Sequence, residues 1–239
     1  MKRYSYIDLI ALLGVGSAHP GGFMLTKQTL QSVYISPSTR VLDVGCGTGR
    51  TAVYIAKLYG CPVTALDNHR FMLEKAQKHI QREGVPVRLV EGNVEQLPFH
   101  SDSFDIALSE SVLIFTDSTK ALQELYRVLS HTGKAIIIEM TVERLLHPKE
   151  KEEIQGVYGV QDILTERQWV EKLYQAGFSR VHKLGGGTVA STIPTYTEQP
   201  DWDFSPQMDS VAYTVWTNHE TIIRKYCHLL GHRTFLCEK

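Results

Sequence analysis

The stretch VLDVGCGTGR, Val41–Arg50, places three alternating glycines directly after a short apolar run. Glycine loses more conformational freedom on folding than any other residue, so this cluster implies a backbone that turns sharply or is approached closely. A strand, a glycine-rich turn and the start of a helix together typically bind a nucleotide-like ligand. A tight strand–helix turn without a ligand is the alternative, but three spaced glycines exceed what such a turn needs.

The spacing within this loop narrows the class of ligand. The dinucleotide fingerprint is G-x-G-x-x-G, and here Arg50 stands where its third glycine would be. The phosphate-binding pattern G-x-x-x-x-G-K-[ST] is absent from the sequence, which argues against an ATP or GTP hydrolase. Asp67 ends the next apolar run, where a carboxylate can accept hydrogen bonds from ribose hydroxyls in either class of adenosine cofactor.

Strand-like and helix-like segments alternate after residue 37. Such alternation predicts an α/β fold with a parallel sheet covered by helices on both faces. The charged run 147–153 is predicted to be a solvated linker or a helix face. The predicted strands are 41–44, 62–67, 86–93, 104–110, 134–140 and 179–184, and the predicted helices are 51–60, 71–84, 118–130 and 165–178.

Five segments resemble, in order and spacing, the successive motifs of the class I S-adenosylmethionine-dependent methyltransferases, most closely the branch that acts on small molecules. They are VLDVGCGTGR, VTALD, EGNVEQLPF, SFDIALSE and LQELYRVLSHTGKAIIIE, and they span about residues 38–140. The resemblance implies a doubly wound, Rossmann-like sheet of seven mostly parallel strands with an antiparallel last strand. It implies one domain over 1–239, with an N-terminal lid (1–36), a cofactor-binding core (37–184), an insertion (185–230) and the last strand (231–239).

The resemblance also implies S-adenosyl-L-methionine as the cofactor and gives individual residues a role. Asp43 would orient the loop and the methionine end of the cofactor, and Asp67 would hold the ribose hydroxyls. Asn93 stands where the family commonly has an acid, but its side chain can still pair with the adenine amino group. The backbone carbonyl of Ser109 would meet the cofactor's ammonium. The implied cofactor-binding residues are Asp43, Gly45, Cys46, Gly47, Gly49, Asp67, Asn68, Asn93, Val94 and Ser109.

Two residues are candidates for the acceptor side, and no catalytic residue is assigned beyond them. His19 lies in the segment GSAHPGGFMLT, which looks like a lid over the methionine end, and it could reach the substrate. A helix-to-helix turn with a surface histidine is the alternative. Glu110 follows the fourth predicted strand, where a carboxylate could orient or deprotonate an acceptor. A solvated or structural glutamate is equally compatible with that position.

The composition limits the kinds of partner that the chain can bind. The chain has 239 residues, with 25 basic and 26 acidic side chains, and no basic stripe of the kind that binds nucleic acid. No apolar run is long enough to span a membrane. The four cysteines are too few for a disulfide framework, and His228 and His232 with nearby cysteines match no usual zinc spacing, so no metal is predicted.

The N-terminus loosely resembles a secretion signal, because Lys2 and Arg3 precede the apolar segment IDLIALLGVGSA. Asp8 interrupts that short segment, which favours an amphipathic first helix. Since S-adenosylmethionine is made and used in the cytosol, the family resemblance predicts a retained N-terminus and a cytoplasmic protein.

The segment between Lys183 and Arg224 contains no lysine or arginine. Acidic and aromatic groups together favour an amine or another small, partly apolar acceptor. The simpler interpretation is that the acids are solvated and that the aromatic residues belong to the core. The alternatives are a methyltransferase for RNA or protein, a cofactor-binding protein without catalysis and a dinucleotide oxidoreductase. The acids and aromatics are Glu198, Asp201, Asp203, Asp209, Glu220, Tyr196, Trp202, Phe204, Tyr213 and Trp216.

Overall fold

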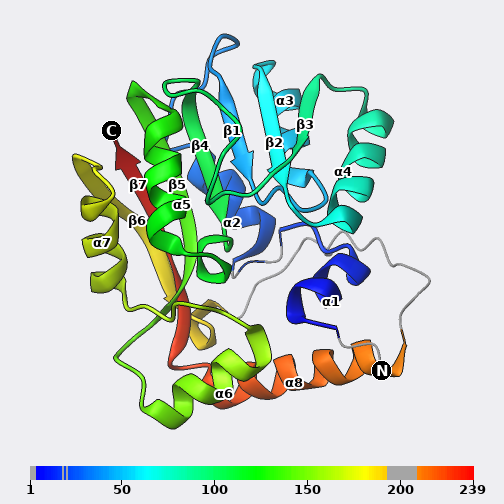
Figure 1. The fold of residues 1–239 in the computed structure, drawn as a ribbon, viewed down its shortest axis with the longest axis vertical. Helices are drawn as coiled ribbons and strands as arrows, with labels where there is room; N and C mark the ends of the chain where they lie inside the picture. Colours follow the sequence, from blue (N-terminus) through cyan, green and yellow to red (C-terminus); the bar gives the residue numbers. More distant parts are fainter. Residues whose placement is uncertain (1–3, 18, 20, 193–208) are drawn as a thin grey trace.

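The computed structural model describes residues 4–17, 19, 21–192 and 209–239. Seven strands of this part of the chain form one sheet in the order β3-β2-β1-β4-β5-β7-β6 (Figure 1). The strands are β1 (Val41–Val44), β2 (Val63–Asp67), β3 (Val87–Glu91), β4 (Phe104–Glu110), β5 (Leu129–Val142), β6 (Arg180–Thr188) and β7 (Leu230–Glu238). The helices are α1 (Tyr6–Leu13), α2 (Gly22–Leu30), α3 (Arg50–Tyr59), α4 (Arg70–Glu83), η1 (Leu113–Phe115), α5 (Ser118–Val128), α6 (Pro148–Tyr158), α7 (Glu166–Gln175), η2 (Ala190–Thr192) and α8 (Ser210–Tyr226).

The strand pairing confirms the predicted doubly wound sheet. β1 pairs in parallel with β2 and β4, β3 with β2, and β5 with β4, whereas β7 lies between β5 and β6 and is antiparallel to both. The chain winds outward from β1 in both directions, so the strand order reverses between β1 and β4. Ligands of open α/β sheets bind beyond the carboxyl ends of the strands at this switch point.

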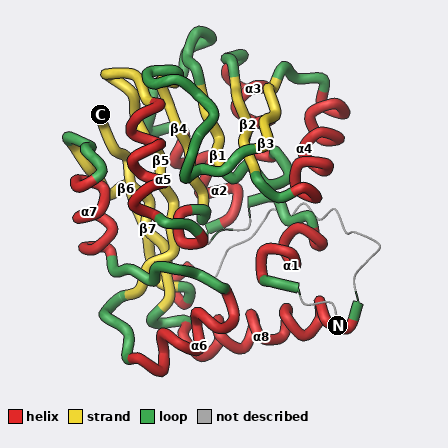
Figure 2. Tube along the Cα trace, in the orientation of Figure 1, coloured by secondary structure: helices red, strands yellow, loops and turns green. Residues whose placement is uncertain are grey.

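Helices cover both faces of the sheet because successive strand residues point to opposite sides. In β4, Ile106 and Leu108 pack toward the α3 face, whereas the intervening Ala107 belongs to the core under α5 and α7. Strands buried on both sides are typical of parallel sheets. Figure 2 shows the resulting helix–sheet–helix layers. The layers fix the edge of the sheet at which the carboxyl ends of β1, β2 and β4 meet.

A second group of helices, α1, α6 and α8, lies beyond that edge (Figure 1). α8 packs against α1 and α6, and Leu9, Leu12 and Leu13 of α1 are buried with Ala212 of α8. The predicted first helix is therefore present, and the charged run 147–153 belongs to α6. Among the described residues, no helix combines the length and apolar character that crossing a membrane requires.

Two predicted boundaries of the insertion are wrong. β6 continues to Thr188, and β7 already begins at Leu230, because the two strands pair along their whole length from Arg180↔Glu238 to Thr188↔Gly231. The sequence analysis predicts this strand over 179–184, just before three consecutive glycines at 185–187. They instead permit close strand pairing, since a Cβ on Gly231 would overlap the backbone of Gly187. The division into one domain stays a prediction.

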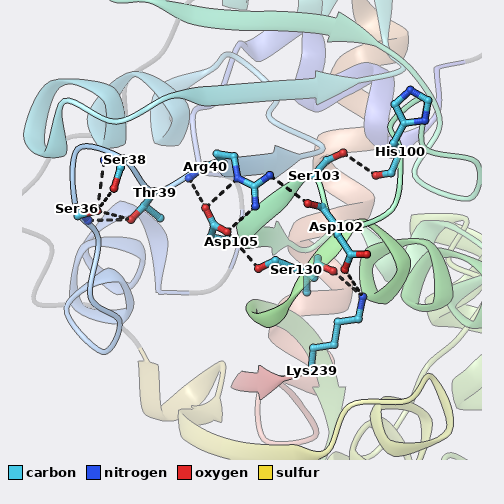
Figure 3. A network of polar contacts seen from close by, with 11 residues as sticks. Ser36, Ser38, Thr39, Arg40, His100, Asp102, Ser103, Asp105, Ser130 and Lys239 are labelled. Carbon is cyan, nitrogen blue, oxygen red and sulfur yellow. Dashed lines mark hydrogen bonds and ion pairs between the residues drawn. The ribbon is translucent and has the colours of Figure 1, made fainter.

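A polar network joins β1 and β4 near their amino ends, on the side of the sheet opposite the switch-point site (Figure 3). Arg40, directly before β1, donates to Asp105 of β4 through Nε (3.1 Å) and Nη2 (2.7 Å), and its backbone N–H donates to the same carboxylate (2.9 Å). The Ser130 hydroxyl donates to Asp105 as well. The Arg40 guanidinium lowers the pKa of Asp105. Half-exposed pairs contribute little stability, so this network chiefly sets the register of β1 against β4.

Candidate active site

The glycine loop between β1 and α3 requires glycine for two different reasons. Gly45, Gly47 and Gly49 have φ values of 64°, 54° and 75°, in the left-handed region that other residues avoid. A Cβ on Gly45 would also overlap Cγ2 of Val112 and lie 3.1 Å from its Cγ1. A Cβ on Gly47 would meet only the sulfur of Met72, at 4.0 Å. Gly45 and Gly47 line a cavity of about 690 Å³.

Glu139 of β5 holds the segment that contacts Gly45. Its Oε1 accepts hydrogen bonds from the backbone N–H groups of Val112 (3.0 Å) and Leu113 (2.8 Å). Glu139 is fully buried, and burial raises its pKa to about 8. The sequence interpretation missed this residue, because an acid inside the run IIIE gives no sign of the loop it supports.

Asp43 and Asp67 meet at the cavity wall. Burial above all, then the nearby carboxylates of Glu110 and Asp67, raises the pKa of Asp43 well above its usual range. Asp43 Oδ2 is buried without a hydrogen-bond partner among the described residues. Asp67 accepts from the N–H groups of Gly47 (2.9 Å) and His69 (2.8 Å), which ties the glycine loop to β2. Burial raises the pKa of Asp67 as well.

Most of the residues implied as cofactor ligands surround this cavity, but three do not line it. Gly49 is the N-cap of α3, and a Cβ there would lie 3.3 Å from Cβ of Ala76. Asn93 Oδ1 accepts from the N–H of Glu95 (2.9 Å), and Ser109 is fully buried. Gly92 lines the cavity and was not in the predicted set. The predicted residues on the wall are Asp43, Gly45, Cys46, Gly47, Asp67, Asn68 and Val94.

The two acceptor-side candidates, His19 and Glu110, come together at the cavity. His19 Nε2 lies 3.7 Å from Glu110 Oε1, and the side chain of His19 is 1% exposed. The Thr26 hydroxyl donates to Glu110 Oε1 (2.7 Å) and lies 3.1 Å from His19 Nε2. Since a hydroxyl has one hydrogen, Thr26 accepts from His19, which places the ring hydrogen on Nε2. Thr51 donates to Glu110 Oε2 (2.9 Å).

The N-terminal segment reaches the glycine loop through α2 as well. The Arg50 guanidinium lies over the ring of Phe23, 4.2 Å from its centroid. Ser17, His19 and Gly21 line the cavity together with Arg50. The described residues of this segment therefore border the cavity, and its role as a lid stays a prediction. Thr26 was missed because a threonine inside a helix gives no signal of a tertiary contact.

The far part of the cavity is lined by aromatic rings. They come from α1, η1, α6 and α8, which are distant in sequence, and we call this part the aromatic chamber. Trp216 is one of them, whereas Trp202 lies outside the described residues. Asp209 caps α8 and Glu220 pairs with Arg224, and neither lines the cavity. The rings of the aromatic chamber are Tyr6, Phe115, Tyr158, Trp216 and His219.

Cys227, His228, His232 and Cys237, near the C-terminus, do not line this cavity. All four cysteines are free, and no group of three or more potential metal ligands occurs among the described residues. His232 is buried in β7, and burial above all lowers its pKa to about 4. His228 lies in the turn before that strand.

The sheet order and the glycine loop at its switch point define the class: the chain belongs to the class I S-adenosylmethionine-dependent methyltransferases. Residues 41–133 match the methyltransferase domain family. The uncharacterized methyltransferase YodH of Bacillus subtilis is 36% identical over 237 residues, covering 98% of this chain and 99% of that protein. The predicted family and its cofactor S-adenosylmethionine are confirmed.

Two other similar proteins act on different compounds. The ubiquinone/menaquinone biosynthesis C-methyltransferase UbiE of Blochmanniella floridana is 34% identical over 118 residues, 47% of this chain and 46% of that protein. The structure of Haemonchus contortus phosphoethanolamine N-methyltransferase 2, in complex with phosphomonomethylethanolamine and S-adenosylhomocysteine, superposes with a TM-score of 0.76. It is 19% identical, and the match covers 98% of this chain and 57% of that one.

Proposed function

We propose that this enzyme transfers the methyl group of S-adenosylmethionine to a small, partly apolar acceptor held in the aromatic chamber. The observation that carries the proposal is that the glycine loop and the aromatic chamber line one cavity of about 690 Å³. This arrangement brings a cofactor site and an acceptor site next to each other. Glu110 and His19 line the same cavity and supply polar groups for the acceptor.

The residues around the glycine loop suit the cofactor. The buried, unpartnered Oδ2 of Asp43 is an acceptor for a donor group such as the cofactor's ammonium. Gly45 and Gly47 let the backbone approach the ligand, and Asp67 keeps lone pairs for the ribose hydroxyls beside the two N–H groups it binds. Asn68 and Val94 line the cavity and would contact the adenine.

The chemistry requires mainly that the acceptor be oriented. S-adenosylmethionine supplies a methyl group that is bound to a positively charged sulfur. This sulfur is a good leaving group and needs no protonation by an acid. Orienting the two reactants is the largest contribution that the protein can make. The carboxylate of Glu110, held by Thr26 and Thr51, would accept the proton of the acceptor's nucleophilic group at Oε1.

An amine acceptor is the second candidate, because the Glu110 carboxylate could pair with an ammonium at the cavity wall. A polymer acceptor, RNA or protein, is less favoured, since the cavity contains one arginine and no lysine among the described residues that line it. We expect the enzyme to act in the cytosol, because S-adenosylmethionine is made and used there. Measured turnover of an acceptor would exclude a protein that binds the cofactor without catalysis.

Replacing Asp67 by Ala should weaken the binding of S-adenosylhomocysteine by about 1–3 kcal/mol, or roughly 5- to 150-fold, because two ribose hydroxyls lose their acceptor. Asp67→Asn should be milder, since one acceptor oxygen remains. Isothermal titration calorimetry measures both. Glu91→Gln is the matched control, because Glu91 pairs with Asp67 in the next strand, is exposed and does not line the cavity. Parent-like affinity of Asp67→Ala would contradict the ribose assignment.

A further inference from the structure

The aromatic chamber contains a pair of hydrogen-bonded, uncharged side chains. Tyr158 Oη of α6 lies 2.9 Å from Nδ1 of His219 in α8. Burial, the main cause, lowers the pKa of His219 and raises the pKa of Tyr158. The imidazole is therefore neutral and the phenol protonated near neutral pH.

The rings around His219 fix its orientation. Its ring stacks on Tyr6 with centroids 5.2 Å apart and an interplanar angle of 30°. The ring of Tyr158 meets it edge-on at 5.6 Å, and Trp216 lies 5.8 Å away at a tilt of 49°. With Nδ1 bonded to Tyr158, Nε2 has no hydrogen-bond partner among the described residues. His219 lines the cavity, and an imidazole nitrogen without a partner can form one hydrogen bond with a ligand.

The charged side chains on the cavity wall come from elements other than those that form the aromatic chamber. Asp43, Arg50, Asp67 and Glu110 come from β1, α3, β2 and β4. The side chains that α1, η1, α6 and α8 contribute to the wall, as far as these helices are described, are uncharged and mostly apolar or aromatic. A charged group in this chamber would lose its hydration without gaining a counter-ion.

We infer that the aromatic chamber selects an uncharged acceptor with a flat, apolar body and one hydroxyl or carbonyl group, which hydrogen-bonds to His219. This selectivity rests on the proposed function, because only there is the compound in the chamber the methyl acceptor. Tyr158 is a positioning residue, because it fixes the His219 ring through Nδ1. A hydroxyl matches either tautomer of His219, since it both donates and accepts.

The test measures the binding of four naphthalene probes by calorimetry, each with and without saturating S-adenosylhomocysteine. The probes are naphthalene, 2-naphthol, 2-naphthoate and 2-naphthylmethylammonium. The parent should bind 2-naphthol at least about tenfold more tightly than either charged probe. His219→Phe should weaken 2-naphthol about 3- to 10-fold and leave naphthalene unchanged, because one neutral hydrogen bond is lost. Tyr158→Phe should change 2-naphthol binding in the same direction.

His228→Phe is the control, since His228 is exposed, lies in the turn after α8 and does not line the cavity. Tighter binding of 2-naphthoate or of the ammonium probe would overturn the inference. An unchanged preference for 2-naphthol over naphthalene in His219→Phe, or no binding of any probe to the parent, would also overturn it. Failure of the parent to bind S-adenosylhomocysteine is a separate result, which overturns the proposed function and leaves the selectivity of the chamber to be judged from the probes.

Discussion

Replacing Glu110 by Gln should lower the rate of methyl transfer by about 100-fold or more, because the amide cannot take the acceptor's proton. The affinity for S-adenosylhomocysteine should stay within about twofold, because the amide oxygen can still accept from Thr26 or Thr51. The rate is measured as single-turnover transfer of a labelled methyl group to an acceptor found by screening. The binding constant comes from calorimetry on the same preparation.

Thr26→Val serves as the graded comparison for Glu110→Gln. It removes the hydrogen bond to Oε1 and the link to His19 but keeps the carboxylate. Its rate should therefore fall less than that of Glu110→Gln. An unchanged rate in Glu110→Gln would make this glutamate structural. An equal loss of cofactor affinity and rate would place Glu110 on the cofactor instead of the acceptor.

Replacing Gly45 by Ala should lower the free energy of unfolding by about 2–5 kcal/mol. The left-handed backbone costs a residue with a Cβ about 1–2 kcal/mol, and overpacking adds about 1–3 kcal/mol. The overlap is with the Val112 side chain, which cannot easily withdraw because Glu139 holds its backbone N–H. Denaturant titration measures the change, and calorimetry should show at least about tenfold weaker binding of S-adenosylhomocysteine.

Two further variants separate strain from overlap. Gly60, at the end of α3, has a φ of 63°, and a Cβ there would have no atom within 4 Å. Gly60→Ala should therefore show the backbone cost alone and normal cofactor binding. Adding Val112→Ala to Gly45→Ala removes the overlapping methyl groups, so the pair should be less destabilising than the sum of the two single changes. A Gly45→Ala protein as stable as Gly60→Ala would contradict the packing described for the loop.

The core of the fold was predictable because its signals are local. The run VLDV, the glycines after it and the carboxylate at the end of VTALD each report a backbone requirement within a few residues. The doubly wound sheet with an antiparallel last strand then followed from the family resemblance. The sequence analysis missed the start of β5, because a glycine such as Gly133 is typical of a turn. In the structure, β5 begins at Leu129, which pairs with Phe104 of β4.

The acceptor half of the cavity was less predictable because tertiary packing assembles it. Tyr6, Tyr158 and His219 lie on three helices far apart in sequence, and no spacing links them. Thr26 and Glu139 act through a contact that only the folded chain creates. Trp216, one of the aromatic residues that the sequence analysis names for the acceptor, lines the cavity. The acids named with it were a poorer guide, since Asp209 and Glu220 have local partners.

A crystal structure with bound S-adenosylhomocysteine tests the central claim most directly. The account predicts the ribose hydroxyls at Asp67, the adenine near Asn68 and Val94, and the sulfur facing Glu110. Beyond the sulfur, the remaining space should be bordered by Trp216 and His219. A cofactor bound away from the glycine loop, or an aromatic chamber separated from the sulfur by other side chains, would contradict it.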